Sequence, residues 1–252
     1  MTLLYILLAT LAGGVVSVAL AAVLSLTWLS RFADRMIAFA VGVMLTTAFT
    51  DLLPEALSLG LSPQAAGGVM LCGLLAFFML EKAALWRHDH SHAPTSKLTA
   101  SPQVALIVLG DGLHNFVDGV LIAAAFLSDP TLGWTTAMAV LAHEIPQEIG
   151  DFMVLLGAGL TRRKALALNA LSGATMVVGG ALGYAALSHA QTAIPCVLVL
   201  SAASFIYIAV ADLVPELHRK RQPRDALMQM TLMVLGVGMI LGVAWALAQV
   251  HG

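Results

Sequence analysis

Charged residues are scarce in this chain. Asp, Glu, Lys and Arg make up 10% of the 252 residues, whereas hydrophobic residues make up 60%. A soluble domain carries about 25% charged residues, so this chain cannot cover a water-exposed surface. The composition therefore excludes a soluble enzyme and a disordered protein. The formal net charge of -2 also lacks the basic excess that nucleic-acid binding requires. What is left is a protein that crosses a lipid bilayer several times.

Cysteine is almost absent as well, whereas long apolar runs fill most of the sequence. Cys72 and Cys196 both lie in such runs and define neither a disulfide framework nor a cysteine-based metal motif. A membrane-spanning helix needs about 20 mostly apolar residues, and the runs are continuous rather than alternating as in a β-barrel. They predict an all-α membrane protein with eight transmembrane helices, over residues 3–28, 36–58, 64–86, 103–127, 132–158, 164–188, 194–217 and 226–249.

The predicted helices form one transmembrane domain over residues 1–252, and lysine and arginine orient it. All twelve basic residues lie at or between helices 1 and 2, 3 and 4, 5 and 6, or 7 and 8. Because cytoplasmic loops carry the excess of lysine and arginine, we expect both termini on the extracytoplasmic side. The domain then consists of helices 1–3 (3–86), a histidine-containing cytoplasmic loop (87–102), central helices 4–5 (103–158) and helices 6–8 (164–249).

A short acidic motif occurs twice. DLLPE at Asp51–Glu55, near the end of helix 2, recurs as DLVPE at Asp212–Glu216, near the end of helix 7. Helices 2 and 7 run in opposite directions, so the two copies predict an inverted repeat of helices 1–3 and 6–8 around the central pair 4–5, an arrangement typical of alternating access. The alternative is that each proline only marks a helix end.

Polar side chains gather deep in the two central helices. On helix 4, one face about 100° wide carries Asp111, His114, Asn115 and Asp118. On helix 5, a wider face carries His143, Glu144, Gln147, Glu148 and Asp151. No Lys or Arg lies deep in any predicted helix, although each buried charge costs about 2.5–3.5 kcal/mol. Compensation must come from protonation, water or a bound cation.

This ligand set points to a metal. Imidazole, carboxylate and amide oxygens together suit borderline divalent ions such as Zn²⁺, Fe²⁺ or Mn²⁺. Pro146 should kink helix 5 and free the carbonyl of Ala142 beside the site. The alternative is a polar network that only joins the two helices, or a proton relay without metal.

Two motifs on these helices resemble the signatures of the ZIP family of divalent metal transporters. They are DGLHNFVDG at Asp111–Gly119 and HEIPQEIGD at His143–Asp151. The second is similar to the subfamily pattern His-Glu-x-Pro-His-Glu-x-Gly-Asp, with Gln147 in place of the second histidine. The resemblance implies a binuclear metal site, and the ligands that we expect are His114, Asn115, Asp118, His143, Glu144, Gln147 and Glu148.

The resemblance also implies how the protein works. It implies uptake of Zn²⁺, with Fe²⁺, Mn²⁺ or Cd²⁺ as alternatives, into the cytosol, without a prosthetic group, by a homodimer whose central helices move against a scaffold. The amide of Gln147 should bind metal more weakly than the histidine it replaces, and helix 6 adds only Asn169 and Ser172 as weak ligand candidates.

Several expectations surround this central site. We expect the ion to pass Asp51 and Glu55 on its way in and Asp212 and Glu216 on its way out. The loop histidines His88, His90 and His92 would either collect metal or be incidental. A bacterial plasma membrane is the expected location.

Two other functions remain as alternatives. A monovalent cation/proton antiporter would use the acids but leaves the two deep histidines unexplained. An intramembrane metalloprotease is suggested by His143-Glu144, but the zinc motif of that class needs histidine at position 147.

Overall fold

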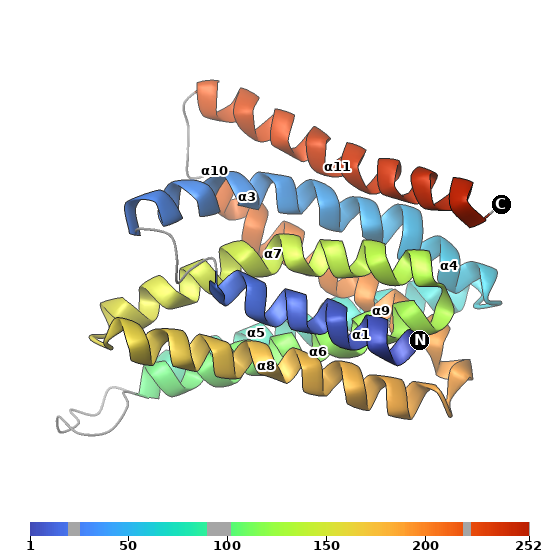
Figure 1. Ribbon diagram of the computed structural model, residues 1–252, viewed down its shortest axis with the longest axis horizontal. Helices are drawn as coiled ribbons and strands as arrows, with labels where there is room; N and C mark the ends of the chain where they lie inside the picture. Colours follow the sequence, from blue (N-terminus) through green and yellow to red (C-terminus); the bar gives the residue numbers. More distant parts are fainter. Residues whose placement is uncertain (20–25, 90–101, 219–222, 252) are drawn as a thin grey trace.

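The computed structural model describes residues 1–19, 26–89, 102–218 and 223–251, and every regular element in them is a helix (Figure 1). Three of these elements are π-helical (η1, η2, η4) and one is a short 3₁₀ turn (η3). The elements are α1 (Thr2–Leu11), η1 (Ala12–Val16), α3 (Leu26–Thr46), η2 (Thr47–Leu52), α4 (Leu53–Ser58), α5 (Pro63–Asp89), α6 (Pro102–Ser128), α7 (Pro130–Gly157), α8 (Arg162–Leu187), η3 (Gln191–Ala193), α9 (Ile194–Tyr207), η4 (Ile208–Leu213), α10 (Val214–His218) and α11 (Pro223–His251). The prediction of an all-α protein is confirmed.

Several helices are long and apolar enough to cross a membrane. Among the described residues there are six such stretches: Thr2–Ala19, Arg35–Ser58, Ile107–Ser128, Arg162–Leu187, Gln191–His218 and Asp225–Ala246. The 28 residues of α7 include three acids, Glu144, Glu148 and Asp151, which lower its apolar character. The protein is thus a multi-pass membrane protein, and the count of eight crossings stays a prediction.

One helix boundary differs from the sequence prediction. α3 begins at Leu26, whereas helix 1 was expected to reach residue 28 and helix 2 to begin at 36. Residues 26–28 therefore belong to the second helix, whose backbone also includes Arg31 and Arg35. Hydropathy marks the apolar part of a helix, and the backbone hydrogen bonds continue past it through charged residues.

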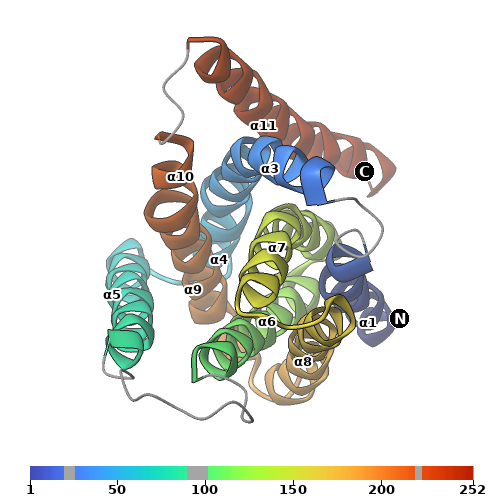
Figure 2. The same ribbon diagram turned by 90° about the vertical axis from the view of Figure 1, so that its left-hand side faces the viewer.

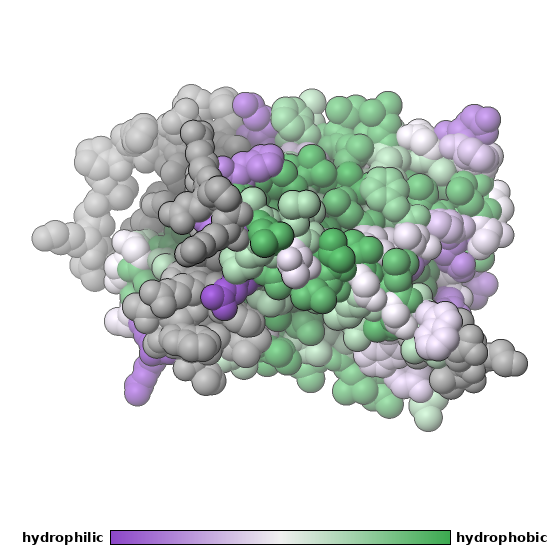
Figure 3. Space-filling view, turned by 90° about the horizontal axis from the view of Figure 1, so that it is seen from above, coloured by the Kyte–Doolittle hydropathy of each residue, from purple (hydrophilic) through white to green (hydrophobic). Residues whose placement is uncertain are grey.

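The helix ends fall at two opposite ends of the bundle (Figure 1). Both chain termini and the turns α4–α5, α6–α7 and α8–α9 lie at one end, and the α7–α8 turn lies at the other. The first turn of α8, directly after the α7–α8 turn, carries the exposed basic residues Arg162, Arg163 and Lys164. A band of hydrophobic side chains covers the middle of the face in Figure 3, with hydrophilic ones toward both ends. Exposed Leu227, Val234 and Trp245 of α11 are part of the apolar surface, as expected for helices in contact with lipid.

Seen along the bundle, α7 lies among α1, α3, α6 and α8 (Figure 2). Outside this centre, α5 packs on α9, and α11 packs on α3. In terms of the predicted repeat, the third helix of each group therefore packs on the second helix of the other group.

Both copies of the acidic motif share a local distortion. The π segment η2 ends at Leu52, two residues before Pro54, and η4 ends at Leu213, two residues before Pro215. Proline has no N–H to donate and crowds the carbonyl four residues earlier, and a π turn is one way to accommodate it. The prolines therefore do not end these helices.

Glycines bring particular helices into backbone contact. A Cβ atom on Gly14 of η1 would collide with the carbonyl oxygen of Gly173 in α8, and the reverse also holds. In the same way, Gly42 of α3 lies against the backbone of Met233 in α11. Such close approach lets helices pack firmly within a membrane.

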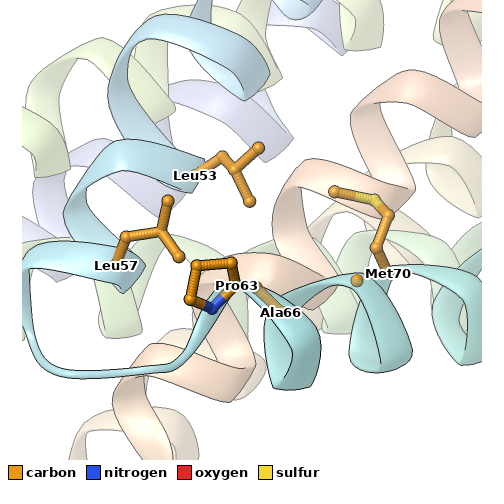
Figure 4. Close-up of a pocket in the computed structure, with 6 residues that line it drawn as sticks. Leu53, Leu57, Pro63, Ala66 and Met70 are labelled. Atoms are coloured by element: carbon orange, nitrogen blue, oxygen red, sulfur yellow. The ribbon is translucent and has the colours of Figure 1, made fainter.

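A small apolar pocket lies between α4 and the start of α5 (Figure 4). Its lining contains no charged or hydroxyl side chain and consists of Leu53, Leu57, Pro63, Ala66, Gly67 and Met70. The polar residues of the central helices do not reach it, so it is not the candidate site.

Candidate metal centre

The polar faces predicted for the two central helices meet in the structure. α6 and α7 pack along one another, and the side chains on the facing sides are withdrawn from the surface. Asn115, Asp118, Glu144 and Glu148 are all 0% exposed. These polar groups therefore lie at the α6–α7 contact and not against lipid.

Four side chains converge on one point, two from each helix. His114, Asp118, His143 and Glu144 each offer a ligand atom, and these atoms all lie within 4.8 Å of one another. Asp118 Oδ2 lies 3.0 Å from His143 Nε2 and 3.7 Å from His114 Nε2. Glu144 Oε1 lies 3.5 Å from His114 Nε2 and 3.6 Å from His143 Nε2. We call these four residues the central cluster; two imidazole nitrogens and two carboxylates are a donor set that zinc accepts.

The ring of His143 is held from two sides. Its Nδ1 lies 3.0 Å from the carbonyl oxygen of Ala139, and its Nε2 lies 3.0 Å from Asp118 Oδ2. Phe205 of α9 packs against the ring edge, with ring centroids 6.0 Å apart. Both ring nitrogens therefore face oxygen acceptors, although a neutral imidazole carries only one N–H.

That arrangement calls for an additional positive charge. If Nδ1 donates to Ala139, the lone pair of Nε2 faces the carboxylate of Asp118; the other tautomer leaves Nδ1 facing the carbonyl. Both carboxylate oxygens of Glu144 are buried without a hydrogen-bond partner, and the buried carboxylate of Asp118 faces the two histidine rings. A proton or a metal ion at Nε2 removes the conflict. A dication would also compensate the negative charge of the second carboxylate, that of Glu144.

A second set of polar groups lies one turn further along both helices, around Asp111. The amide nitrogen of Asn115 donates to Asp111 Oδ1 at 3.0 Å, and that of Gln147 lies 3.5 Å from the same oxygen. Both carboxylate oxygens of Glu148 are buried without a hydrogen-bond partner. We call Asp111, Asn115, Gln147 and Glu148 the adjoining cluster.

α8 supports both central helices through residues that the sequence did not single out for this role. Asn169 donates to the backbone carbonyl of Glu148 at 2.9 Å, and the hydroxyl of Thr175 donates to that of Gly112 at 2.5 Å. Asn169, considered above as a weak ligand, thus contacts backbone. The spacing of Asn169, Ser172 and Thr175 at three-residue intervals on a helix that is otherwise apolar on that face was the available signal.

The outer acids lie away from the central cluster. Asp51 in η2 accepts a hydrogen bond from Thr50 at 2.8 Å, and Glu55 in α4 accepts one from Ser128, at the end of α6, at 2.6 Å. Asp212 is exposed and lies in η4, and Glu216 is half-buried and lies in α10.

Pro146 is accommodated within a continuous α7.

The loop histidines fall at the edge of the described chain. The backbone of His88 belongs to α5, and His90 and His92 lie outside the described residues.

Comparison with known proteins finds similarity to zinc transporters. A family model described as "ZIP Zinc transporter" matches residues 87–244. The human protein named zinc transporter ZIP10 is 38% identical over 141 residues, which cover 52% of this chain and 17% of that protein. The Drosophila melanogaster zinc transporter foi is 38% identical over 154 residues, 61% of this chain and 21% of the relative.

A third relative matches more of the chain. Pongo abelii zinc transporter ZIP13 is 32% identical over 217 residues, 81% of this chain and 64% of the relative. The chain thus spans less than two thirds of the length of these three relatives. All three are animal proteins, and they lend no support to the expected bacterial membrane.

Proposed function

Because the chain belongs to the ZIP zinc transporter family, we propose that it carries a divalent metal ion, zinc first of all, across a membrane into the cytosol. The ion would bind between α6 and α7 at the central cluster. The metal is cargo, so its site must accept it from one side of the membrane and release it to the other. Fe²⁺, Mn²⁺ and Cd²⁺ are further candidate cargoes, since the same nitrogen and oxygen donors bind them.

The observation that carries the proposal is the convergence of two imidazole nitrogens and two buried carboxylates at the central cluster. The four ligand atoms all lie within 4.8 Å of one another, and neither oxygen of Glu144 has a hydrogen-bond partner. A dication held by His114, Asp118, His143 and Glu144 gives each of these lone pairs a partner. A network that only joined two helices would instead pair donors with acceptors inside itself.

The arrangement of the helices supports alternating access. The reciprocal packing of α5 on α9 and of α11 on α3, together with a π segment before each repeated proline, is what an inverted repeat produces. With eight crossings, both termini would lie outside the cytoplasm, and the basic α7–α8 turn would face it.

Tight packing suggests which parts move together. The backbone of η1 contacts that of α8 at Gly14 and Gly173, and the backbone of α3 contacts that of α11 at Gly42. We propose that α6 and α7 move with α1 and α8 against a scaffold that includes α3 and α11. A homodimer would hold two such scaffolds fixed in the membrane.

The outer and inner acids would guide the ion to and from the site. Glu55, which contacts Ser128 at 2.6 Å, and Asp51 would lie on the outer side, and Asp212 and Glu216 on the cytoplasmic side. Carboxylates at both mouths would raise the local concentration of cations.

The two alternative functions find no support. The relatives are named as zinc transporters, which is consistent with a protein that is not an enzyme. The zinc motif of a metalloprotease also requires a histidine at position 147, where this chain has glutamine. A monovalent cation/proton antiporter would leave the convergence of two imidazoles within 3.3 Å unexplained.

The test is zinc flux into proteoliposomes that contain a zinc-sensitive dye. We expect His143→Ala to reduce flux to the level of empty vesicles, and His189→Ala, an exposed histidine beyond the end of α8, to leave it unchanged. Flux that survives His143→Ala at the parental rate would refute the proposed site. Proton or sodium exchange without zinc flux would favour the antiporter.

A further inference from the structure

The part of α7 that carries Gln147 and Glu148 is a weak stretch of helix. Pro146 lies just before it inside the helix, has no N–H to donate and crowds the carbonyl of Ala142. Gly150 lies just after it and lowers helix stability further. A Cβ atom on Gly150 would meet no other described helix within 4 Å, so close packing does not require this glycine. The position of this stretch therefore depends on contacts from neighbouring helices.

In contrast, α6 is held firmly by α8. A Cβ atom on Gly119 of α6 would collide with the carbonyl oxygen of Met176 in α8. One on Gly179 of α8 would collide with the carbonyl oxygen of Phe116 in α6. Phe116 and Gly119 lie on either side of Asp118 in the sequence, and backbone contact of this kind makes two membrane helices pack as a unit. α8 therefore fixes the turn of α6 that carries a ligand.

Asn169 of α8 joins this pair of helices to α7. The residue is 2% exposed, and its amide nitrogen donates to the backbone carbonyl of Glu148 at 2.9 Å. The reverse orientation of the amide would place an oxygen against the carbonyl oxygen, and both are acceptors. The hydrogen bond thus reaches α7 between Pro146 and Gly150, in the stretch that most needs a contact from outside.

The contacts between α6 and α7 at the central cluster run between the ligand atoms themselves. His114 Nε2 lies 3.3 Å from His143 Nε2 and 3.5 Å from Glu144 Oε1. An ion that takes these atoms as ligands replaces such contacts, so they cannot align the two helices both with and without metal. The bond from Asn169 uses none of these atoms and can persist in both states.

From these contacts we propose that Asn169 is a positioning residue of the metal site. It acts through the backbone of Glu148 and keeps the ligands of α7 aligned with those of α6 before the metal arrives. This inference rests on the proposed function, and it gives Asn169 a role other than that of the weak ligand considered from the sequence. A site that is already ordered binds its ion more tightly, because less has to be ordered on binding.

The experiment replaces Asn169 by leucine, which has nearly the same shape but no N–H. Zinc binding is measured by calorimetry on the purified protein. We expect the free zinc concentration at half-saturation to rise about tenfold, as for the loss of other groups that support metal ligands. Gln229→Leu is the matched control, because the amide of Gln229 in α11 also donates to a backbone carbonyl, that of Leu217, at 3.2 Å. Its zinc affinity should equal that of the parent.

Zinc flux into proteoliposomes separates positioning from a purely structural role. In Asn169→Leu the KM for zinc should rise by the same factor as the half-saturation, while the maximal flux stays unchanged, because every ligand is still present. A residue that only stabilised the fold would lower the maximal flux and the Tm and leave the KM as it is.

A second variant serves if Asn169→Leu does not fold. Asn169→Ser should bond within α8, as the hydroxyl of Ser172 does with the carbonyl of Leu168, and so leave Glu148 without the contact. Co²⁺ then distinguishes positioning from ligation, because its absorption bands report the ligands bound to it. At saturating Co²⁺ the bands of a folded variant should match those of the parent.

Two results would overturn the inference and leave the proposed function intact. One is an unchanged zinc affinity in a folded Asn169 variant, and the other is a shift of the Co²⁺ bands, which would make Asn169 a ligand. A parent protein that binds no zinc would instead overturn the proposed function.

Discussion

Replacing Asp118 by asparagine changes the charge of the central cluster while almost preserving its shape. The Asp118 carboxylate is fully buried, and it faces the rings of His143 and His114. Oδ2 lies 3.0 Å from His143 Nε2 and 3.7 Å from His114 Nε2. An ion bound to both histidines would therefore lie close enough to this oxygen for the carboxylate to serve as a ligand.

The expected loss follows from that geometry. Two unit charges 4 Å apart interact by about 4 kcal/mol at an effective dielectric constant of 20, so a dication gains about 8 kcal/mol from the carboxylate. Dehydration of both ions cancels much of this attraction, and asparagine still offers a carbonyl oxygen. We expect a net loss of at least about 1.4 kcal/mol, which is a tenfold weaker Kd.

The assay is thermal unfolding of the purified protein with and without zinc. A ligand at 100 times its Kd stabilises a protein by about 2.7 kcal/mol, which corresponds to a rise in Tm of about 5–11 °C for a chain of this size. Asp118→Asn should lose about half of this rise or more at the same zinc concentration, since a tenfold weaker Kd leaves about 1.4 kcal/mol of stabilisation.

The thermal stability of the metal-free variant provides a second, independent test. Because an ionised Asp at the centre of a membrane helix costs about 2.5–3.5 kcal/mol, metal-free Asp118→Asn should be at least as stable as the metal-free parent. A variant that keeps the full zinc-dependent rise in Tm would show that Asp118 is not a ligand. If the metal-free variant unfolds at a lower temperature than the metal-free parent, other groups compensate the charge of Asp118 when no metal is bound.

Two further predictions concern protons and packing. Imidazole binds metal only in its neutral form, so zinc affinity, measured by calorimetry, should fall on acidification from pH 7.5 to 5.5; an affinity independent of pH would contradict ligation by His114 and His143. Gly14→Ala should destabilise the protein by about 1–3 kcal/mol, because the new methyl meets the Gly173 carbonyl, whereas Gly67→Ala has open space; equal Tm values for the two variants would be evidence against a locked η1–α8 contact.

The class of protein and the facing sides of α6 and α7 could be predicted from the sequence because both depend on local patterns. Apolar length signals a membrane helix, and the 100° period places His114 and Asp118 on one side of a helix whatever surrounds it. The meeting of these two residues with His143 and Glu144 followed once α6 and α7 became neighbours. The number of crossings and the orientation of the termini stay predictions.

Other features could not be read from local patterns. The membership of residues 26–28 in α3 was missed because hydropathy records where a helix is apolar and not where it ends. One alternative was that the prolines of the acidic repeat mark helix ends, yet each follows a π segment inside a continuous helix. The support of Thr175 for the Gly112 carbonyl depends on the approach of α8.

The sequence by itself determined that this protein is a bundle of membrane helices with histidines and acids buried in its centre, because hydropathy and helical period act over a few turns. Only the tertiary structure decided which of these groups face lone pairs and which face N–H donors. Asp111 and Asp118 lie on the same face of α6, yet the first faces the amides of Asn115 and Gln147 and the second faces the ring of His143. That difference arises from the neighbouring helix, since a hydrogen bond requires a partner at the right distance and in the right orientation.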